Sequence, residues 1–245
     1  MDAARHATLV RARALTPSVR ELTFAPSPPV AFVPGQWVNL LVRDPSARAG
    51  ADPLKRSYSI ASPPRDDGSF DLAVTRVAGG PMSERLHAAS IGDVFELSHA
   101  QGFFTLASPR RNVLLVATGT GVAPFRAMLN DRSVRAEADE LGARFLLLLG
   151  AREERDLLYR DEWLGLRAAW KGFDFAPTLS RAEAGWSGRR GYVQAHLAEL
   201  VADLGGPAAI DAYVCGLQKM VGEVRRALRD ALGVPRERIH HERYD

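Results

Sequence analysis

The sequence changes its pattern near residue 109, and that change restricts the fold more than any other feature. Before this point, short segments of alternating or β-branched and aromatic residues are separated by turns rich in proline and glycine. Regularly spaced short strands of this kind predict an antiparallel barrel or sandwich. We expect the strands within residues 8–15, 19–25, 37–43, 57–62, 70–77 and 94–98. One helix is expected over residues 83–90, with Ser83 as its N-cap.

After this point, strands alternate with helices, and the strands are almost continuously apolar. Helical crossovers between apolar strands predict a parallel sheet that is covered on both faces. We expect strands over residues 112–118, 144–150, 173–180, 211–216 and 238–245, and helices over 123–132, 159–170, 193–204 and 218–232. The predicted fold therefore has two domains, an antiparallel β-barrel over residues 1–108 followed by an α/β parallel-sheet domain over residues 109–245.

Composition excludes several classes of protein. The chain carries a net charge of +3, and its arginines are scattered through every expected element. This is not the basic stripe of a nucleic-acid-binding protein, although a local patch for an acidic protein partner remains open. The longest aliphatic run, 145–149, is too short to cross a membrane, and residues 1–13 contain no apolar leader. We expect a cytoplasmic monomer that binds neither membrane nor nucleic acid.

Cysteine and histidine usage limits the cofactors. Cys215 is the only cysteine, so the chain has no internal disulfide. An iron–sulfur cluster held by cysteines alone needs four of them, so any such cluster must belong to a partner. The histidines show no ligand spacing, because His240 and His241 are adjacent and would point to opposite faces of a strand. No metal site is predicted.

Two glycine-rich turns open helices and are candidate anion sites. In "ATGTGVAPFRAML", residues 117–129, Gly119 and Gly121 flank Thr120 directly after a buried strand. Such a loop leaves helix N-terminal amides free for a phosphate, although Pro124 replaces the third glycine of the dinucleotide fingerprint. "AGGPMSERL", residues 78–86, offers amides in the same way. A plain turn from strand to helix is the alternative for residues 117–129. For residues 78–86 the alternative is a helix capped by Ser83, which is compatible with an anion site.

Other polar groups stand at expected strand ends. In "KRSYSIASPP", residues 55–64, alternation places Arg56 and Tyr58 on one face of a strand, where they could hold a phosphate and stack on a flat ring. Arginines and a hydroxyl in "TLSRAEAGWSGRRGYV", residues 178–193, would suit a phosphate monoester. An exposed edge strand and a solvated loop are the respective alternatives. Cys215 is expected at a strand tip, either buried or functional.

The order of these motifs resembles the ferredoxin–NADP+ reductase family, specifically its compact bacterial members. The resemblance runs along essentially the whole chain. The segments that carry it are "FVPGQWVNLLV", "RSYSIASP", "GGPMSERL", "GDVFELSHAQGFFTL", "ATGTGVAPFRAML", "LSRAEAGWSGR", "VCGLQKM" and the C-terminal "ERY".

The resemblance implies an FAD site in the first domain and an NADP(H) site in the second. Arg56 would hold the flavin pyrophosphate, Tyr58 would stack on the isoalloxazine beside Ser57, and Ser59 would reach the ring nitrogen that accepts hydride. The second wall and the pyrophosphate turn would comprise Ala73, Val74, Thr75, Pro81, Met82 and Ser83. Two features depart from the family pattern: Asp245 stands where bacterial relatives carry a further aromatic residue, and "RRG" precedes Tyr192 where plant-type relatives have a lysine.

The resemblance also implies the nucleotide contacts and the partner. Thr120 would lie between flavin and nicotinamide, with Cys215, Glu242 and the aromatic Tyr244 beside them. The catalytic set is thus Ser59, Cys215 and Glu242, and the adenosine 2′-phosphate would meet Arg152, Ser180, Arg181 and Arg189. Hydride would pass between NADP(H) and FAD, and single electrons would pass to or from ferredoxin or flavodoxin. Two alternatives stay open: an NAD(P)H-dependent flavin or ferric reductase, and a flavin relay subunit or regulatory module of a larger complex.

Overall fold

The computed structural model describes residues 5–42, 53–107 and 111–244, which divide into two compact units. Unit 1 comprises residues up to 105 together with 123–131, and unit 2 comprises 106–122 and 132 onward. The chain therefore leaves unit 1, returns to it for one short segment and leaves it again. The expected domain boundary at 108/109 lies outside the described residues, and so does Asp245, where the sequence departs from the family pattern.

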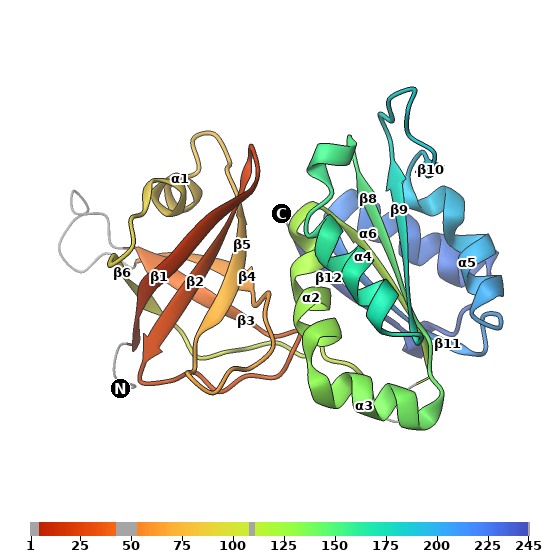
Figure 1. Cartoon of the computed structure of the whole chain (residues 1–245), viewed down its shortest axis with the longest axis horizontal. Helices are drawn as coiled ribbons and strands as arrows, with labels where there is room; N and C mark the ends of the chain where they lie inside the picture. Colours follow the sequence, from red (N-terminus) through yellow and green to blue (C-terminus); the bar gives the residue numbers. More distant parts are fainter. Residues whose placement is uncertain (1–4, 43–52, 108–110, 245) are drawn as a thin grey trace. The chain divides into compact units, whose positions relative to one another are not determined.

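Unit 1 contains an antiparallel sheet of six strands in the order β4-β3-β6-β1-β2-β5 (Figure 1). A bridge between Ile60 and Leu72 joins the two edge strands, and the Ala61 amide donates to the Asp71 carbonyl at 2.7 Å. The sheet thus closes on itself as the predicted barrel. Its strands are β1 (Arg5–Thr16), β2 (Val19–Ser27), β3 (Trp37–Val42), β4 (Leu54–Ser59), β5 (Phe70–Thr75) and β6 (Val94–Leu97).

Alternation along these strands fills the barrel with apolar side chains. Phe24 meets Phe70 and Phe95 with ring centroids 6.1 and 5.6 Å apart, and helix α1 (Pro81–Ala88) adds Met82 and Leu86 to the same core. Aromatic pairs at these spacings contribute beyond the area that they bury. The barrel is therefore a packed scaffold, and ligands must bind on its outside or at its rims.

Two sequence-based details of unit 1 were wrong. Helix α1 begins at Pro81 with Gly80 as its N-cap, so Ser83 lies within the first turn and does not cap it. The Ser83 hydroxyl instead accepts from the Val77 amide at 3.0 Å and contacts the Gly80 carbonyl at 3.0 Å, which closes the preceding turn. Strand β4 also begins and ends about three residues earlier than expected, because Ile60 pairs across to Leu72.

Unit 2 contains the predicted parallel sheet, in the order β10-β9-β8-β7-β11-β12. Strands β8 and β11 lie on opposite sides of β7, so the strand order reverses at β7. The carboxyl end of such a strand is the usual ligand site of an open α/β sheet. The strands are β7 (Asn112–Thr118), β8 (Phe145–Ala151), β9 (Phe173–Leu179), β10 (Arg189–Arg190), β11 (Ile210–Leu217) and β12 (Ile239–Tyr244).

Helices cover both faces of this sheet (Figure 1). Leu114 and Val116 face a core shared with α5 (Leu197–Asp203) and α6 (Gln218–Arg226). On the other face, Trp163 of α4 (Arg160–Ala169) packs against strand β9. Because successive residues of a strand point to opposite faces, an apolar run such as "NVLLVAT" satisfies both layers at once.

Helix α3 (Arg132–Leu141) is an element that the sequence analysis missed. Its segment "RSVRAEADEL" is rich in charge and buries only Val134 and Ala138. Two small apolar residues four positions apart give too weak a periodic signal for a prediction. The two-residue strand β10 was missed as well, and α6 ends at Arg226, where a π-helical segment covers 227–231.

Candidate functional site

Strand β4 places the first group of predicted residues. Arg56 and Tyr58 lie on one face and pair with Leu40 and Val38 of β3. Tyr58 packs partly against the barrel core. Burial raises the pKa of Tyr58 to about 12, although the positive charge of Arg56 acts to lower it. The phenol is therefore neutral at physiological pH, and its ring has a fixed backing.

The other members of this motif differ in accessibility. The Arg56 side chain is exposed, and its Nη1 donates to the Lys55 carbonyl at 2.8 Å. On the opposite face the Ser57 hydroxyl donates to Asn39 Oδ1 at 2.9 Å. Ser59 is buried at the end of the strand. The strand thus presents the exposed guanidinium of Arg56 and the ring of Tyr58 on the same side.

The second predicted wall is built mostly from backbone. Val74 and Met82 have side chains in the barrel core, and Ala73 is buried, whereas Thr75 and Pro81 are exposed. The Val74 carbonyl contacts His87 Nε2 at 2.9 Å, which ties β5 to α1. These positions can therefore bind a ligand chiefly through main-chain groups.

The turn before α1 has room for an anion. Gly79 has a φ of +72°, and a Cβ there would meet no atom within 4 Å. Its amide donates to Glu84 Oε1 at 2.9 Å. The first amides of an α-helix have no partner within the helix. Met82 and Ser83 supply those amides here, beside the open glycine.

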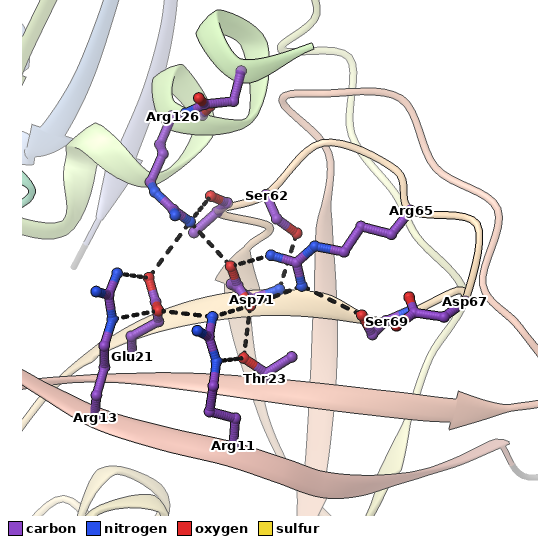
Figure 2. Close-up of polar contacts among 12 residues, drawn as sticks. Arg11, Arg13, Glu21, Thr23, Ser62, Arg65, Asp67, Ser69, Asp71 and Arg126 are labelled. Atoms are coloured by element: carbon purple, nitrogen blue, oxygen red, sulfur yellow. Dashed lines mark hydrogen bonds and ion pairs between the residues drawn. The ribbon is translucent and has the colours of Figure 1, made fainter. Parts of the chain in front are cut away.

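A group of charged side chains surrounds two buried carboxylates on β2 and β5, and the sequence analysis did not detect it (Figure 2). Glu21 and Asp71, with side chains 1% and 0% exposed, are its carboxylates. We call this group the carboxylate cluster, and its arginines are Arg11, Arg13, Arg65 and Arg126. These six residues are dispersed over more than a hundred positions, so no local sequence pattern reveals the cluster.

Each carboxylate has several donors. Arg13 binds Glu21 through two nitrogens at 2.7 and 3.1 Å. The two Nη atoms of Arg65 donate to Asp71 Oδ1 and Oδ2 at 3.0 and 2.5 Å. The Thr23 hydroxyl donates to Asp71 Oδ1 at 2.8 Å. Burial raises the pKa of Asp71. This effect is outweighed by hydrogen bonds from Arg65, Thr23 and Arg126 and by the positive charge of Arg65, so the pKa of Asp71 lies below its ordinary value. Asp71 is therefore ionised inside the protein.

In unit 2, the loop after β7 fits tightly against β11. It is a short 3₁₀ turn, Gly119–Val122. A Cβ at Gly121 would stand 2.3 Å from the Cys215 carbonyl, so only glycine fits there. Gly119 has a φ of +53° with open space beside it. Thr118 Oγ1 is buried without a hydrogen-bond partner in the described structure, and Thr120 is half-buried.

The predicted residues of β11 and β12 are neighbours in the sheet. Cys215 pairs with Ala117 on one side and Glu242 on the other, and Leu217 pairs with Tyr244. Burial raises the pKa of the Cys215 thiol well above its usual range, and the negative charge of Glu242 raises it further. A hydrogen bond with Tyr244 lowers the pKa but does not offset these two effects. Cys215 is therefore a neutral thiol beside the glycine loop.

The predicted arginine site divides into two parts. Backbone bonds join the ends of β8 and β9: the Ser180 amide donates to Ala151 at 3.0 Å, and the Arg181 amide donates to Arg152 at 2.8 Å. The side chains of Arg152, Ser180 and Arg181 are all exposed at these adjacent ends. A phosphate could therefore be reached by both guanidinium groups.

Arg189 and Arg190 have other contacts. Arg189 Nε donates to Glu199 Oε1 at 2.7 Å. Arg190 donates to the carbonyls of Ala182, Glu183 and Trp186 at 2.8–3.0 Å and so closes the loop that follows β9. The structure thus leaves Arg152 and Arg181 available and occupies the other two.

The described residues contain no group of three or more His, Cys, Asp or Glu side chains placed to hold a metal ion. Within the same residues, no helix has the length and apolarity needed to span a membrane.

Two known domain families match successive parts of the chain. Residues 6–106 match the oxidoreductase FAD-binding domain, and residues 115–226 match the oxidoreductase NAD-binding domain. The first match covers the barrel with β4 and the α1 turn. The second match begins in β7 and ends in α6, so it includes the glycine loop, the arginine region and Cys215.

The chain is 46% identical over 98% of its length to ferredoxin–NADP reductase B of Sorangium cellulosum, covering 97% of that protein. It is 31% identical over 97% of its length to the xylene/toluene monooxygenase electron transfer component XylA of Pseudomonas putida, of which it spans 65%. Among solved structures, a ferredoxin NADP+ reductase from Neisseria gonorrhoeae with bound FAD and NADP superposes with a TM-score of 0.84, 22% identity and 99% coverage of both chains. These relationships show that the chain belongs to the ferredoxin–NADP+ reductase family of FAD-dependent oxidoreductases.

Proposed function

We propose that this chain is a ferredoxin–NADP+ reductase, which exchanges hydride between NADP(H) and bound FAD and exchanges single electrons with ferredoxin or flavodoxin. The observation that carries the proposal is the 46% identity to a ferredoxin–NADP reductase over nearly the full length of both chains. A flavin is the cofactor that such an exchange requires, since it takes up an electron pair and releases the electrons one at a time.

The residues of unit 1 fit FAD. The exposed Arg56 and the backed ring of Tyr58 share one face of β4, as a dinucleotide with a pyrophosphate and a flat ring system requires. The open turn at Gly79 and the amides of α1 suit the pyrophosphate. We assign the flavin contacts to Arg56, Ser57, Tyr58, Ser59, Ala73, Val74, Thr75, Pro81, Met82 and Ser83.

The residues of unit 2 fit NADP(H). The buried hydroxyl of Thr118, which has no partner, and the open Gly119 stand at the strand end where the sheet order reverses. We assign the 2′-phosphate to Ser180, Arg181 and Arg152, with Arg189 contributing only if its bond to Glu199 opens. Thr120 and Tyr244 are assigned to the nicotinamide end.

The catalytic assignments follow from the state of each group. Ser59 is buried at the end of the flavin strand, where its hydroxyl can orient the flavin ring. Cys215 contributes a neutral, compact thiol, because a thiolate is disfavoured by burial and by Glu242. Glu242 is the neighbour of Cys215 on the adjacent strand, and its carboxylate is close enough to raise the pKa of the Cys215 thiol. We therefore assign the orientation of the flavin ring to Ser59 and that of the nicotinamide to Cys215 and Glu242.

Removing Arg56 tests the flavin assignment. Arg56→Ala should weaken FAD retention by roughly 1.5–3 kcal/mol, since a bond between a charged donor and a phosphate is lost. Lys55→Ala removes the neighbouring exposed cation from the opposite face of the strand and should retain FAD. Flavin absorbance after dialysis would report both. A wild type that stays colourless after incubation with FAD would contradict the proposed function itself.

The partner assignment is tested by salt. Ferredoxins and flavodoxins are acidic, so exposed arginines should steer their docking, and the rate should fall as ionic strength rises. Cytochrome reduction through added ferredoxin would measure this, and a rate that does not change with salt would argue against a charged carrier. We also propose a cytoplasmic monomer, which size-exclusion chromatography of the holoprotein would test for oligomeric state.

The similarity to XylA favours one further candidate, an electron transfer component of an oxygenase. XylA is longer than this chain, which spans 65% of it. The single Cys215 supplies too few ligands for an all-cysteine cluster within these 245 residues, so any such cluster would lie outside them. Reduction of an added ferredoxin at rates well above those for free flavin or ferric chelates would favour the reductase over the alternatives.

A further inference from the structure

Helix α2 (Ala123–Asn130) follows the glycine loop of unit 2 but belongs to unit 1. Its apolar face explains this. Phe125 lies 5.8 Å from Phe104, measured between ring centroids, and Met128 Cε would lie 2.7 Å from a Cβ at Gly35. The loop Gly119–Val122 is thus continuous at one end with β7 of unit 2 and at the other with a helix of unit 1.

Arg126, in the first turn of α2, is the member of the carboxylate cluster that comes from this helix (Figure 2). Its Nη1 donates to the Ala61 carbonyl at 2.8 Å and to Asp71 Oδ2 at 3.0 Å, and it lies 3.4 Å from Glu21 Oε2. Its side chain is only 11% exposed. One guanidinium therefore joins α2 to a backbone carbonyl and to two buried carboxylates.

The carbonyl that Arg126 binds is next to the flavin strand. Ala61 stands two residues after Ser59. Asp71 holds the same segment from the other side, because its carbonyl accepts from the Ala61 amide at 2.7 Å and its amide donates to Ser62 Oγ at 3.0 Å. A short series of bonds thus connects the end of "RSYSIAS" with the helix that begins after "TGTGV".

Charge neutralisation alone does not account for Arg126. Glu21 is already bound by Arg13 through two nitrogens and by Arg11 at 3.4 Å. Asp71 is already held by Arg65 through two nitrogens. Each carboxylate would therefore keep a charged donor if Arg126 were removed. What the cluster would lose is its connection to α2.

We propose that Arg126 is a positioning residue: by bonding to Ala61 and Asp71, it fixes helix α2, which directly follows the glycine loop in the chain, to the segment after the flavin strand. The inference rests on the proposed function, because it gives this connection a role in hydride transfer. Thr120 lies in the loop, three residues before α2 begins. Its position should therefore depend on how firmly α2 is held.

The test compares Arg126→Met with Arg13→Met. Both variants remove one arginine from the cluster and leave each carboxylate a charged partner, but only the first releases α2. Each holoprotein is mixed with NADPH in an anaerobic stopped-flow instrument. For Arg126→Met we expect the limiting rate of flavin reduction to fall by about tenfold to a hundredfold, the cost of misplacing reacting groups by about 1 Å. The NADPH concentration at half-maximal rate and the flavin content should change little.

Two further measurements separate positioning from stability. Arg126→Lys keeps one charged donor and should recover part of the rate. Hydrogen exchange of residues 123–130 should accelerate in Arg126→Met and stay unchanged in Arg13→Met, whether or not the protein reacts with NADPH. Equal reduction rates and equal exchange in the two methionine variants would overturn the inference. A wild type whose flavin NADPH does not reduce would overturn the proposed function, and the exchange comparison would still decide whether Arg126 holds α2.

Discussion

Two pairs of arginines, one in each unit, have opposite tasks. In unit 1, Arg65 and Arg126 are 30% and 11% exposed and are fully engaged with buried carboxylates (Figure 2). In unit 2, Arg152 and Arg181 are exposed at the ends of adjacent strands and form no ion pair among the described residues. The planar guanidinium suits both tasks, because it can hold a carboxylate or a phosphate through two parallel bonds.

The difference shows how burial decides what an arginine can do. A buried charge must be paired, since the interior solvates it poorly, so Arg65 and Arg126 fix local structure. An exposed guanidinium keeps its hydration until a ligand replaces it, so Arg152 and Arg181 can select an anionic ligand.

The largest effect is expected at Asp71. Asp71→Asn removes a fully buried charge that several arginines share, so the free energy of unfolding should fall by roughly 3–5 kcal/mol. The matched control is Asp230→Asn, which breaks an exposed pair with Arg229 and should leave stability unchanged. Urea denaturation followed by circular dichroism would measure both. Equal stabilities of the two variants would show that the cluster is no more important than a surface ion pair.

The next effect concerns nucleotide selection. Arg181→Ala should raise the Michaelis constant for NADPH about tenfold to a hundredfold, because a charge-assisted phosphate bond of roughly 1.5–3 kcal/mol is lost. NADH lacks that phosphate, so its constant should not change.

Arg189→Ala is the matched control, and it should have a smaller effect because Arg189 already binds Glu199. Steady-state kinetics with both nucleotides would decide. Equal damage from the two variants, or equal loss for NADH and NADPH, would remove the distinction between free and occupied arginines.

A smaller effect is expected in the pH dependence of stability. Burial lowers the pKa of His240 and, with nearby Arg225 and Arg243, that of His241 below the ordinary 6.5. Their contribution to stability is therefore present above pH 6.5 and is lost as the pH falls through the lowered values. The pKa of Asp71 is lowered from 3.8, so its contribution is lost only as the pH falls below that value.

Urea midpoints measured as a function of pH would test this separation. A His240→Asn, His241→Asn double variant should flatten the curve just below pH 6.5 and leave the acid end unchanged. Asp71→Asn should do the reverse. A single transition that both variants alter alike would mean that the two units do not titrate independently.

The smallest effect is expected at Cys215. The thiol is fully buried and its pKa is raised, so the reactive thiolate is scarce and inaccessible. Iodoacetamide at pH 8 should leave the native protein unlabelled and should label it completely in urea, as measured by mass spectrometry. Rapid labelling of the native protein would place Cys215 among the exposed groups of unit 2.

Much of the fold could be predicted because its signals are local. The alternation in β2 and the apolar runs in β7 and β8 reflect the periodicity of a strand. Both glycine turns precede helices, as their sequences indicate. The shift of β4 was not predictable, because Ile60 pairs with a residue twelve positions away. Helix α3 was missed because it buries so little.

The same distinction between local sequence signals and long-range contacts applies to the candidate site. The sequence alone placed Arg56 and Tyr58 on one face of a strand and Thr120 in the turn directly after a strand, because a strand fixes the positions of its own residues. Only the tertiary structure decided which arginines are free. Arg189 is occupied by Glu199, ten residues away, and Arg126 reaches Ala61 and Asp71 across more than fifty residues. Partners at such separations are chosen by packing and by the need to pair buried charge, and neither leaves a periodic mark in the sequence.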